Sequence, residues 1–405
     1  MSYGNMGYKT GTGRPMDSTE RPLKQPKVGL VMTGGGARAA YQVGVLRAIS
    51  EMLPADARCP FDIICGTSAG AINATVLAAN AGNFRRGVRQ LMTVWKNFHV
   101  HHVYRADAAG VVRNSGKWLA AAVFGGFGGK TPISLLDNSP LAGLLGTRLA
   151  YDRIQHSIDN GDLYAFSVTC SGYTSSQSVS FFQGASGLEP WQRARRVGVP
   201  TRIGVEHLLA SSALPFIFPA VHINREYFGD GSMRQIAPLS PALHLGADRL
   251  FVIGVGRQLP LQQERVKGVN YPSLAQIAGH CLNSIFLDSL EVDLERLQRI
   301  NRTLGMMPRE VIEKNGTELR TVDFRVVSPS IALEKIAATH VHTLPRTIRA
   351  LLFTVGALRR SGSNLVSYLL FEREFCRALI RLGYEDTIMR REDLMRFLGY
   401  EACWL

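Results

Sequence analysis

The sequence predicts an α/β protein with a mostly parallel central sheet and a helical C-terminal extension. Two successive strand–turn–helix units carry this prediction. An apolar run at residues 28–32 stops at a glycine turn, and apolar residues then recur at helical spacing over residues 39–49. The pattern repeats with a largely apolar run at residues 61–65, a second glycine-containing turn and an Ala-rich helix at residues 72–79. Strands joined in succession by helices predict a parallel sheet.

Later segments extend this sheet and then change in character. Four more runs have the alternating or continuous apolar pattern of strands, at residues 164–170, 178–183, 250–255 and 323–328. The predicted sheet then has about six strands. After residue 258 the composition becomes helical, and residues 287–300 place leucines on one face and most of their charged side chains elsewhere.

The chain is predicted to have three parts. Residues 1–27 form a flexible basic tail, because they are rich in Gly, Ser, Thr and Pro and carry five basic and two acidic residues. Residues 28–258 form the main domain, and residues 259–405 form the mainly helical extension. Residues 118–129 are largely apolar and rich in glycine, and we interpret them either as a mobile lid or as an interfacial loop.

Composition excludes several classes of protein. The 405 residues are 46% apolar and 19% charged, which fits a globular protein and excludes coiled coils, collagen and wholesale disorder. Lys and Arg number 46 against 32 Asp and Glu, so the formal net charge is +14. This balance favours anionic partners, either nucleic acid or an anionic membrane surface, without choosing between them.

The location of the protein is predicted from its cysteines and its apolar runs. The six cysteines are scattered, without a C-x-x-C pair or clustered histidines, and there is no secretion signal. No run reaches the roughly 18 consecutive apolar residues of a membrane-spanning helix. We expect reduced thiols in a cytoplasmic protein that associates peripherally with membranes. No cluster of ligands suggests a metal, and we expect no cofactor.

A candidate nucleophile lies in the second turn. Gly66-x-Ser68-x-Gly70 fits the nucleophile-elbow pattern, in which small neighbours let a serine occupy a tight strand-to-helix turn with its hydroxyl accessible. The alternative is a plain turn in which Ser68 caps the following helix. The N-terminus of that helix would also stabilise developing negative charge.

The first turn is the candidate oxyanion site. Gly34, Gly35 and Gly36 leave backbone N–H groups unhindered at the carboxyl edge of the sheet, beside the turn that holds Ser68. Arg38 follows, and its guanidinium could bind a phosphate or carboxylate or support the glycine turn.

Dinucleotide binding is a competing interpretation of the same turn. Gly34-x-Gly36-x-x-Ala39 satisfies the G-x-G-x-x-G/A fingerprint between a strand and a helix. That fingerprint requires an acid at the end of the second strand to hold the ribose hydroxyls, whereas here Asp62 lies near the start of the strand. The missing acid argues against a nicotinamide cofactor.

A candidate base lies much later in the sequence. Asp230 occupies a turn between Gly229 and Gly231, a setting in which an aspartate is usually only a turn residue. If Asp230 lay against Ser68 in an apolar pocket, desolvation would raise the pKa of its carboxyl and make it a better base.

Together these motifs resemble those of the patatin-like phospholipases, a family of serine lipid acyl hydrolases. Residues 34–39 resemble the family's oxyanion motif, residues 66–70 its nucleophile motif, and Asp230-Gly231 the aspartate motif of a Ser-Asp dyad. The resemblance covers residues 27–255, including the stretch at residues 210–216. It implies a three-layer patatin-like sandwich and makes residues 28–258 the catalytic domain.

The resemblance also implies a mechanism without histidine. In the family the aspartate itself accepts the serine proton and then activates the deacylating water. A Ser-Asp-His triad remains formally open with any of four histidines, His244, His280, His340 and His342. Two residues depart from the family pattern: Ala39 replaces the usual closing glycine, and Ser232 is expected to hydrogen-bond Asp230 and lower its basicity.

The resulting prediction is a lipid acyl hydrolase of the phospholipase A or lysophospholipase type. Ser68 would be the nucleophile, Asp230 the base, and the amides of the glycine turn the oxyanion donors. The partners implied are a phospholipid or other acyl-ester lipid and an anionic membrane surface, with no nucleic acid. The alternative is a catalytically weak protein that binds membranes or other anionic surfaces.

Overall fold

A computed structural model of the chain describes residues 26–107, 116, 134–257, 271–308, 319–354, 356–357 and 362–400. The predicted loop at residues 118–129 lies outside the described residues. So does the predicted tail, apart from its last two residues.

A single mixed sheet organises the described structure, with ten strands in the order β10-β9-β1-β2-β3-β4-β6-β5; β8 pairs with β3 and β7 with β8. The strands are β1 (Val28–Met32), β2 (Ile63–Thr67), β3 (Ala165–Gly172), β4 (Ser178–Gly184), β5 (Trp191–Arg193), β6 (Arg196–Pro200), β7 (Val221–Ile223), β8 (Glu226–Asp230), β9 (Arg249–Ile253) and β10 (Asp323–Val327).

Strands β10, β9, β1, β2 and β3 are neighbours in the sheet and run parallel to one another. These five strands position the site. Met32 at the end of β1 pairs in register with Gly66 of β2, and Thr67 at the end of β2 pairs with Thr169 of β3. The segments that follow β1 and β2 therefore leave the sheet side by side at its carboxyl edge. β8 runs antiparallel to β3 and brings Asp230 opposite Cys170 at the same edge.

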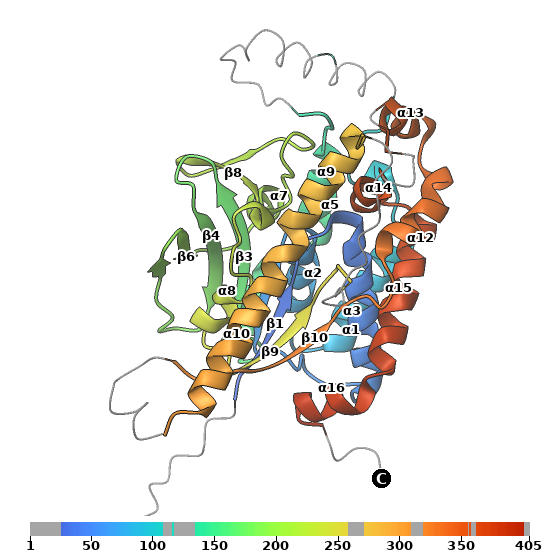
Figure 1. Ribbon diagram of the computed structural model, residues 1–405. Coiled ribbons are helices and arrows are strands. Elements are labelled where there is room, and N and C mark those ends of the chain that lie inside the picture. The colour runs from blue at the N-terminus through green and yellow to red at the C-terminus, as the bar shows by residue number, and fades with distance from the viewer. Residues whose placement is uncertain are drawn as a thin grey trace, which may run out of the picture.

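Helices cover both faces of the sheet (Figure 1). The longer ones are α1 (Ala40–Met52), α2 (Ala69–Ala78), α3 (Phe84–Lys96), α5 (Ser139–Arg148), α9 (Leu274–Asn283), α10 (Ser289–Gly305), α13 (Arg346–Thr354) and α15 (Arg373–Ile388). The shorter ones are α6 (Asp152–Asp159), α7 (Val205–Ser211), α8 (Ser240–His244), α12 (Leu333–His340), α14 (Ser363–Leu369) and α16 (Arg391–Leu398).

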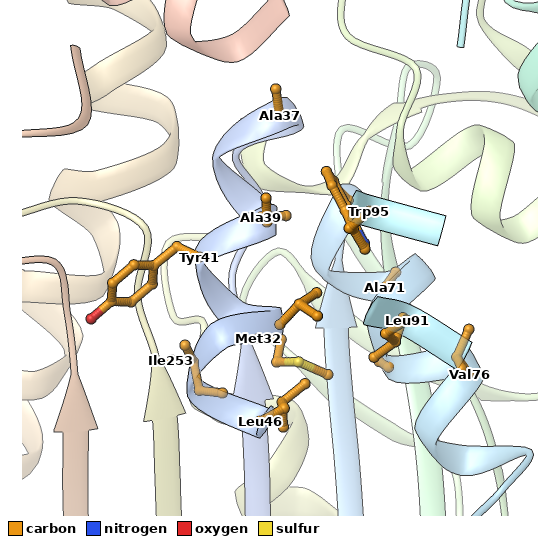
Figure 2. Packing of buried hydrophobic residues seen from close by; sticks show 14 of the residues in the cluster. Met32, Ala37, Ala39, Tyr41, Leu46, Ala71, Val76, Leu91, Trp95 and Ile253 are labelled. Atoms are coloured by element: carbon orange, nitrogen blue, oxygen red, sulfur yellow. The ribbon is translucent and has the colours of Figure 1, made fainter. Parts of the chain in front are cut away.

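Two apolar cores lie on the opposite faces of the sheet, because side chains alternate along each strand. Leu30 and Met32 of β1 belong to the larger core with α1, α2, α3 and α15. Figure 2 shows Met32 in this core, together with Leu46 of α1 and Leu91 of α3. Val31 belongs to the second core, which is closed by α8 and α10. Because β1 is buried on both faces, its sequence is a continuous apolar run.

The segment after residue 258 is mainly helical but shares the sheet and core of the earlier residues. It supplies β10, which pairs with β9, and α15, which packs along α1 through two glycines. A Cβ added to Gly44 of α1 would lie 2.1 Å from the carbonyl oxygen of Ile380, and one added to Gly383 of α15 would lie 2.2 Å from that of Tyr41. The two helix backbones therefore touch where a side chain would separate them.

The predicted fold class is confirmed, and the sheet is larger than predicted. All six predicted strands are present, and β2 begins two residues later than expected and continues through Thr67. The four strands that sequence analysis missed are β5 to β8. They are three to five residues long and partly exposed, so they lack the apolar runs by which the others are found. None of the described helices is both long enough and apolar enough to span a bilayer.

Substitution of Gly44 tests the contact between α1 and α15. We expect Gly44→Ala to lower the free energy of unfolding by about 1–3 kcal/mol, because the new methyl group overpacks a backbone contact. Urea denaturation measures this change. Gly143→Ala in α5 is the matched control, since an added Cβ meets nothing within 4 Å there, and it should leave stability unchanged or raise it by up to about 1 kcal/mol. Equal stability of the two variants would contradict the packing described.

Candidate active site

Ser68 occupies a strained turn between β2 and α2. Its backbone has φ 55°, a left-handed conformation that is uncommon for residues other than glycine and is concentrated at functional sites. The flanking glycines are required by close packing. A Cβ on Gly66 would lie 2.5 Å from Cα of Ala71, and one on Gly70 would lie 2.5 Å from the carbonyl oxygen of Met32. The local sequence thus allows the turn to fold tightly against β1.

The Ser68 hydroxyl points to a carboxylate. Its side chain does not cap α2; Oγ instead donates a hydrogen bond of 2.6 Å to Oδ2 of Asp230. The Ser68 amide donates to Oγ of Ser211 at 2.8 Å, and the Ser211 hydroxyl donates to the carbonyl oxygen of Thr169 at 2.6 Å. The last residue of α7 therefore ties the turn to β3. Ser211 received no role from the sequence, although it belongs to the stretch 210–216 that resembles the family.

Asp230 is buried at the end of β8, where its amide donates to the carbonyl oxygen of Ala213. Burial raises the pKa of the Asp230 carboxyl from 3.8 to about 6, although hydrogen bonds from Ser68 and Ser232 lower it. The Ser232 amide donates to Oδ1 at 2.9 Å. The lowering expected from Ser232 is present, and desolvation outweighs it. A carboxylate with a pKa near the working pH is suited to act as a general base.

The glycine turn lies directly against Ser68. A Cβ on Gly34 would lie 2.9 Å from Cβ of Ser68, and Gly36 has φ +54°. Gly36 begins the short 3-10 helix η1 (Gly36–Ala39), and the first N–H groups of a helix have no partner within it. The turn can therefore present amide donors beside the Ser68 hydroxyl. Asp62 binds the amide of Val28 at the opposite edge of the sheet, where it cannot hold a ribose at this turn.

Arg38 faces the C-terminal extension, whereas the sequence predicts either a contact with a phosphate or support of the glycine turn. The residue is 1% exposed. Nε donates to Oγ of Ser367 at 2.8 Å, Nη2 donates to Oδ1 of Asn364 at 3.3 Å, and the guanidinium lies 4.0 Å from the ring centroid of Tyr368. These contacts match the other predicted role, support of the glycine turn. The partners lie more than 320 residues away, so no local signal could have revealed them.

An apolar pocket opens beside the serine and aspartate. The cavity has a volume of about 70 Å³, and its lining includes Ser68, Asp230 and Ser212. The Ser212 side chain is buried, and its hydroxyl has no hydrogen-bond partner among the described residues. Most of the remaining wall is aliphatic or aromatic, the aromatic residues being Trp95, Phe98, Phe218, Phe286, Tyr368 and Phe371. Sequence analysis missed this wall because its residues come from distant segments.

The four histidines of the open triad lie away from this pocket. His244 stacks on Trp191 with ring centroids 5.1 Å apart, and His280 is exposed on α9. His340 and His342 each hydrogen-bond a nearby backbone carbonyl. Among the described residues, none of the four lines the pocket with Ser68. The arrangement that the structure brings together is a serine and an aspartate.

Comparisons with known proteins agree with these motifs. The model of the family described as patatin-like phospholipase matches residues 30–243. Lysophospholipase nte1 of Aspergillus terreus is 40% identical over 82 residues, which are 19% of this chain and 5% of that protein. The chain thus spans only a small part of this curated relative.

Solved structures were also compared. VipD from Legionella pneumophila has 11% identity and a TM-score of 0.34, with 93% of this chain and 67% of that chain covered. Human GIVD cytosolic phospholipase A2 in complex with methyl gamma-linolenyl fluorophosphonate has 14% identity and a TM-score of 0.42, with 94% and 60% covered.

Asp230→Asn tests the cost of burying this carboxylate. Above pH 6 Asp230 is ionised in the folded and unfolded states, and its raised folded pKa means that ionisation opposes folding. We expect the neutral variant to be more stable than the native protein at pH 8 by about 1–3 kcal/mol. The difference should shrink as the pH falls from about 6 to below 4, because Asp230 is then protonated in both states. Unfolding by urea at several pH values measures it. A variant that is less stable at pH 8 would contradict the shift.

Proposed function

Because the chain belongs to the patatin-like phospholipase family, we propose that it hydrolyses carboxylic esters of lipids through an acyl-enzyme on Ser68. The observation that carries this proposal is the 2.6 Å hydrogen bond from the Ser68 hydroxyl to a buried Asp230 on the wall of an apolar pocket. A nucleophile within hydrogen-bond reach of its base is the arrangement that acyl transfer requires.

The acylation step follows from this hydrogen bond. Ser68 Oγ attacks the ester carbonyl carbon while its proton passes to Oδ2 of Asp230. Negative charge then develops on the carbonyl oxygen, where the amides of the glycine turn and the N-terminus of α2 stabilise it. As the tetrahedral intermediate collapses, the bond to the alcohol breaks, and the departing oxygen takes the proton from Asp230. The acyl group stays on Ser68, and the carboxylate is regenerated.

Deacylation repeats the same proton transfers with water as nucleophile. Asp230 accepts a proton from the water, whose oxygen attacks the acyl carbon, and then returns that proton to Ser68 Oγ as the fatty acid leaves. A single carboxylate thus serves both half-reactions. A pKa of about 6 keeps it mostly ionised near neutral pH and still able to return a proton.

The pocket supports a lipid as the substrate. Its aliphatic and aromatic wall suits an acyl chain, and Ser212, whose hydroxyl has no hydrogen-bond partner among the described residues, adds a polar residue to that wall. The local similarity to a protein named a lysophospholipase favours a phospholipid or lysophospholipid ester. The net charge of +14 favours action at an anionic lipid surface.

Labelling with a fluorophosphonate tests the nucleophile. We expect a covalent adduct on Ser68, found by peptide mapping, and no adduct in Ser68→Ala. Asp230→Asn should slow labelling by about 10²–10⁴-fold, the usual contribution of a general base. Ser167→Ala is the control, because Ser167 is also a buried serine but lies in β3 outside the pocket. Ester hydrolysis that persists in Ser68→Ala would reject Ser68 as the nucleophile, and a folded protein that gives no adduct would favour a catalytically weak surface-binding protein.

The pH dependence of kcat/KM tests the base. With a water-soluble ester, kcat/KM should rise with pH to a plateau above about 6, because only ionised Asp230 accepts the serine proton. The Ser232 side chain lowers the pKa of Asp230, so Ser232→Ala should move the midpoint of the profile to higher pH. A profile without an inflection in this range would exclude Asp230 as the base, and an unchanged midpoint in Ser232→Ala would contradict the contribution of the Ser232 side chain.

A further inference from the structure

The exposed side of α9 carries large apolar side chains, with Gln276, His280 and Cys281 as its other exposed residues. Leu274 and Ile277 are 66% and 42% exposed, and Tyr271 continues the same three-residue spacing just before the helix. The opposite face packs on α14, where a Cβ on Gly279 would lie 2.8 Å from Cβ of Asn364. No Asp, Glu, Lys or Arg occurs in α9. Large apolar side chains that are exposed together on a surface helix mark an interaction site.

The N-terminal end of α9 lies close to the segment that follows α13. Gly356 joins the two helices: its added Cβ would lie 3.0 Å from Cβ of Ser273, and its amide donates to the carbonyl oxygen of Phe353. Phe353 is 72% exposed. The N-terminal end of α9 and helix α13 lie at the same end of the molecule (Figure 1). We call Tyr271, Leu274, Ile277 and Phe353 the α9–α13 patch.

The helix that carries most of this patch leads to the pocket. α9 leads directly into the short π-helix η4 (Ser284–Asp288). Phe286 of η4 lines the pocket and stacks on Tyr368 with ring centroids 5.1 Å apart. The Tyr368 hydroxyl donates to Oδ1 of Asn283, the last residue of α9.

An exposed aromatic residue also lies between two pocket-lining residues in the sequence. Phe216 lies between Leu214 and Phe218, both of which line the pocket. It holds a left-handed backbone with φ 66°, which is a genuine outlier for a bulky residue.

We propose that the α9–α13 patch binds the protein to an anionic lipid bilayer, from which an acyl chain enters the pocket beside Ser68. This inference rests on the proposed function, because it names the surface that delivers the substrate. The charge around the patch selects this occupant. α13 carries Arg346 and Arg349 and no acid, and Arg346 is exposed. A second copy of the chain, docked by two-fold symmetry, would bring like charges together, whereas lipid phosphates neutralise them.

Sedimentation with vesicles tests whether the α9–α13 patch binds a bilayer; we call this proposed contact the seat. The vesicles contain equal parts of phosphatidylcholine and phosphatidylserine, and every protein carries Ser68→Ala so that no lipid is consumed. We expect Leu274→Glu with Ile277→Glu to weaken binding by about tenfold or more, because carboxylates then face the bilayer. The control pair is Met306→Glu with Met389→Glu. These exposed methionines end α10 and α15, and those helix ends lie at the other end of the molecule from α13 (Figure 1).

The possible results distinguish lipid binding by the patch from ester hydrolysis at Ser68. With Ser68 restored, the α9 double variant should hydrolyse a water-soluble ester at the native rate and lose hydrolysis of vesicle lipid. Equal vesicle binding by the two double variants, or equal binding of the parent to pure phosphatidylcholine, would overturn the seat. A change in oligomeric state on gel filtration, without a change in vesicle binding, would identify a self-association face instead. If the native chain bound vesicles through the patch but hydrolysed no ester, the proposed function would fail and the seat would stand.

Discussion

The glycine turn packs between Ser68 and α14, and the geometry of the whole site depends on that packing. A Cβ on Gly34 would lie 2.9 Å from Cβ of Ser68, and one on Gly36 would lie 2.3 Å from the carbonyl oxygen of Tyr368. Since neither side leaves room for a side chain, the amides of the turn are held at one distance from the serine. Stabilisation of an oxyanion depends on donors that are fixed before charge develops. The C-terminal extension supplies one side of this constraint, and Arg38 links it to the turn.

The residues of the proposed dyad cost the fold stability, and their neighbours hold them in place. Ser68 has a left-handed backbone, and Asp230 is buried although its carboxyl ionises with a pKa of about 6. Both features oppose folding. Ser211 offsets part of this cost, because its hydroxyl bridges the Ser68 amide to the backbone of β3. The same desolvation that destabilises the carboxylate makes it a stronger base. Burial of Asp230 therefore lowers the stability of the fold and raises the basicity of the carboxylate together.

The sequence could predict the features that depend on neighbouring residues. The two strand–turn–helix units and the glycine-flanked Ser68 are local patterns, and they fold as expected. Asp230 could also be predicted, because the Asp-Gly motif and the flanking glycines that mark its turn are neighbours in the sequence. The direction in which Arg38 points depends on Ser367 and Tyr368, which no local pattern connects to it. The pocket wall was missed for the same reason, since apolar residues from many segments look like ordinary core until the fold brings them together.

The net charge of the chain favours binding to an anionic lipid surface, but it does not indicate which residues would contact the lipid. A charge of +14 acts over the whole molecule, whereas apolar contact with a bilayer needs exposed side chains at one place. The proposed seat on α9 supplies that place, and it connects to the site through Phe286. A Cβ on Gly34 would lie 2.9 Å from the Phe286 ring, so a pocket residue in the segment that follows α9 also packs on the glycine turn. Under this proposal the extension serves substrate entry and oxyanion geometry through the same aromatic contact, and removing it would disturb both.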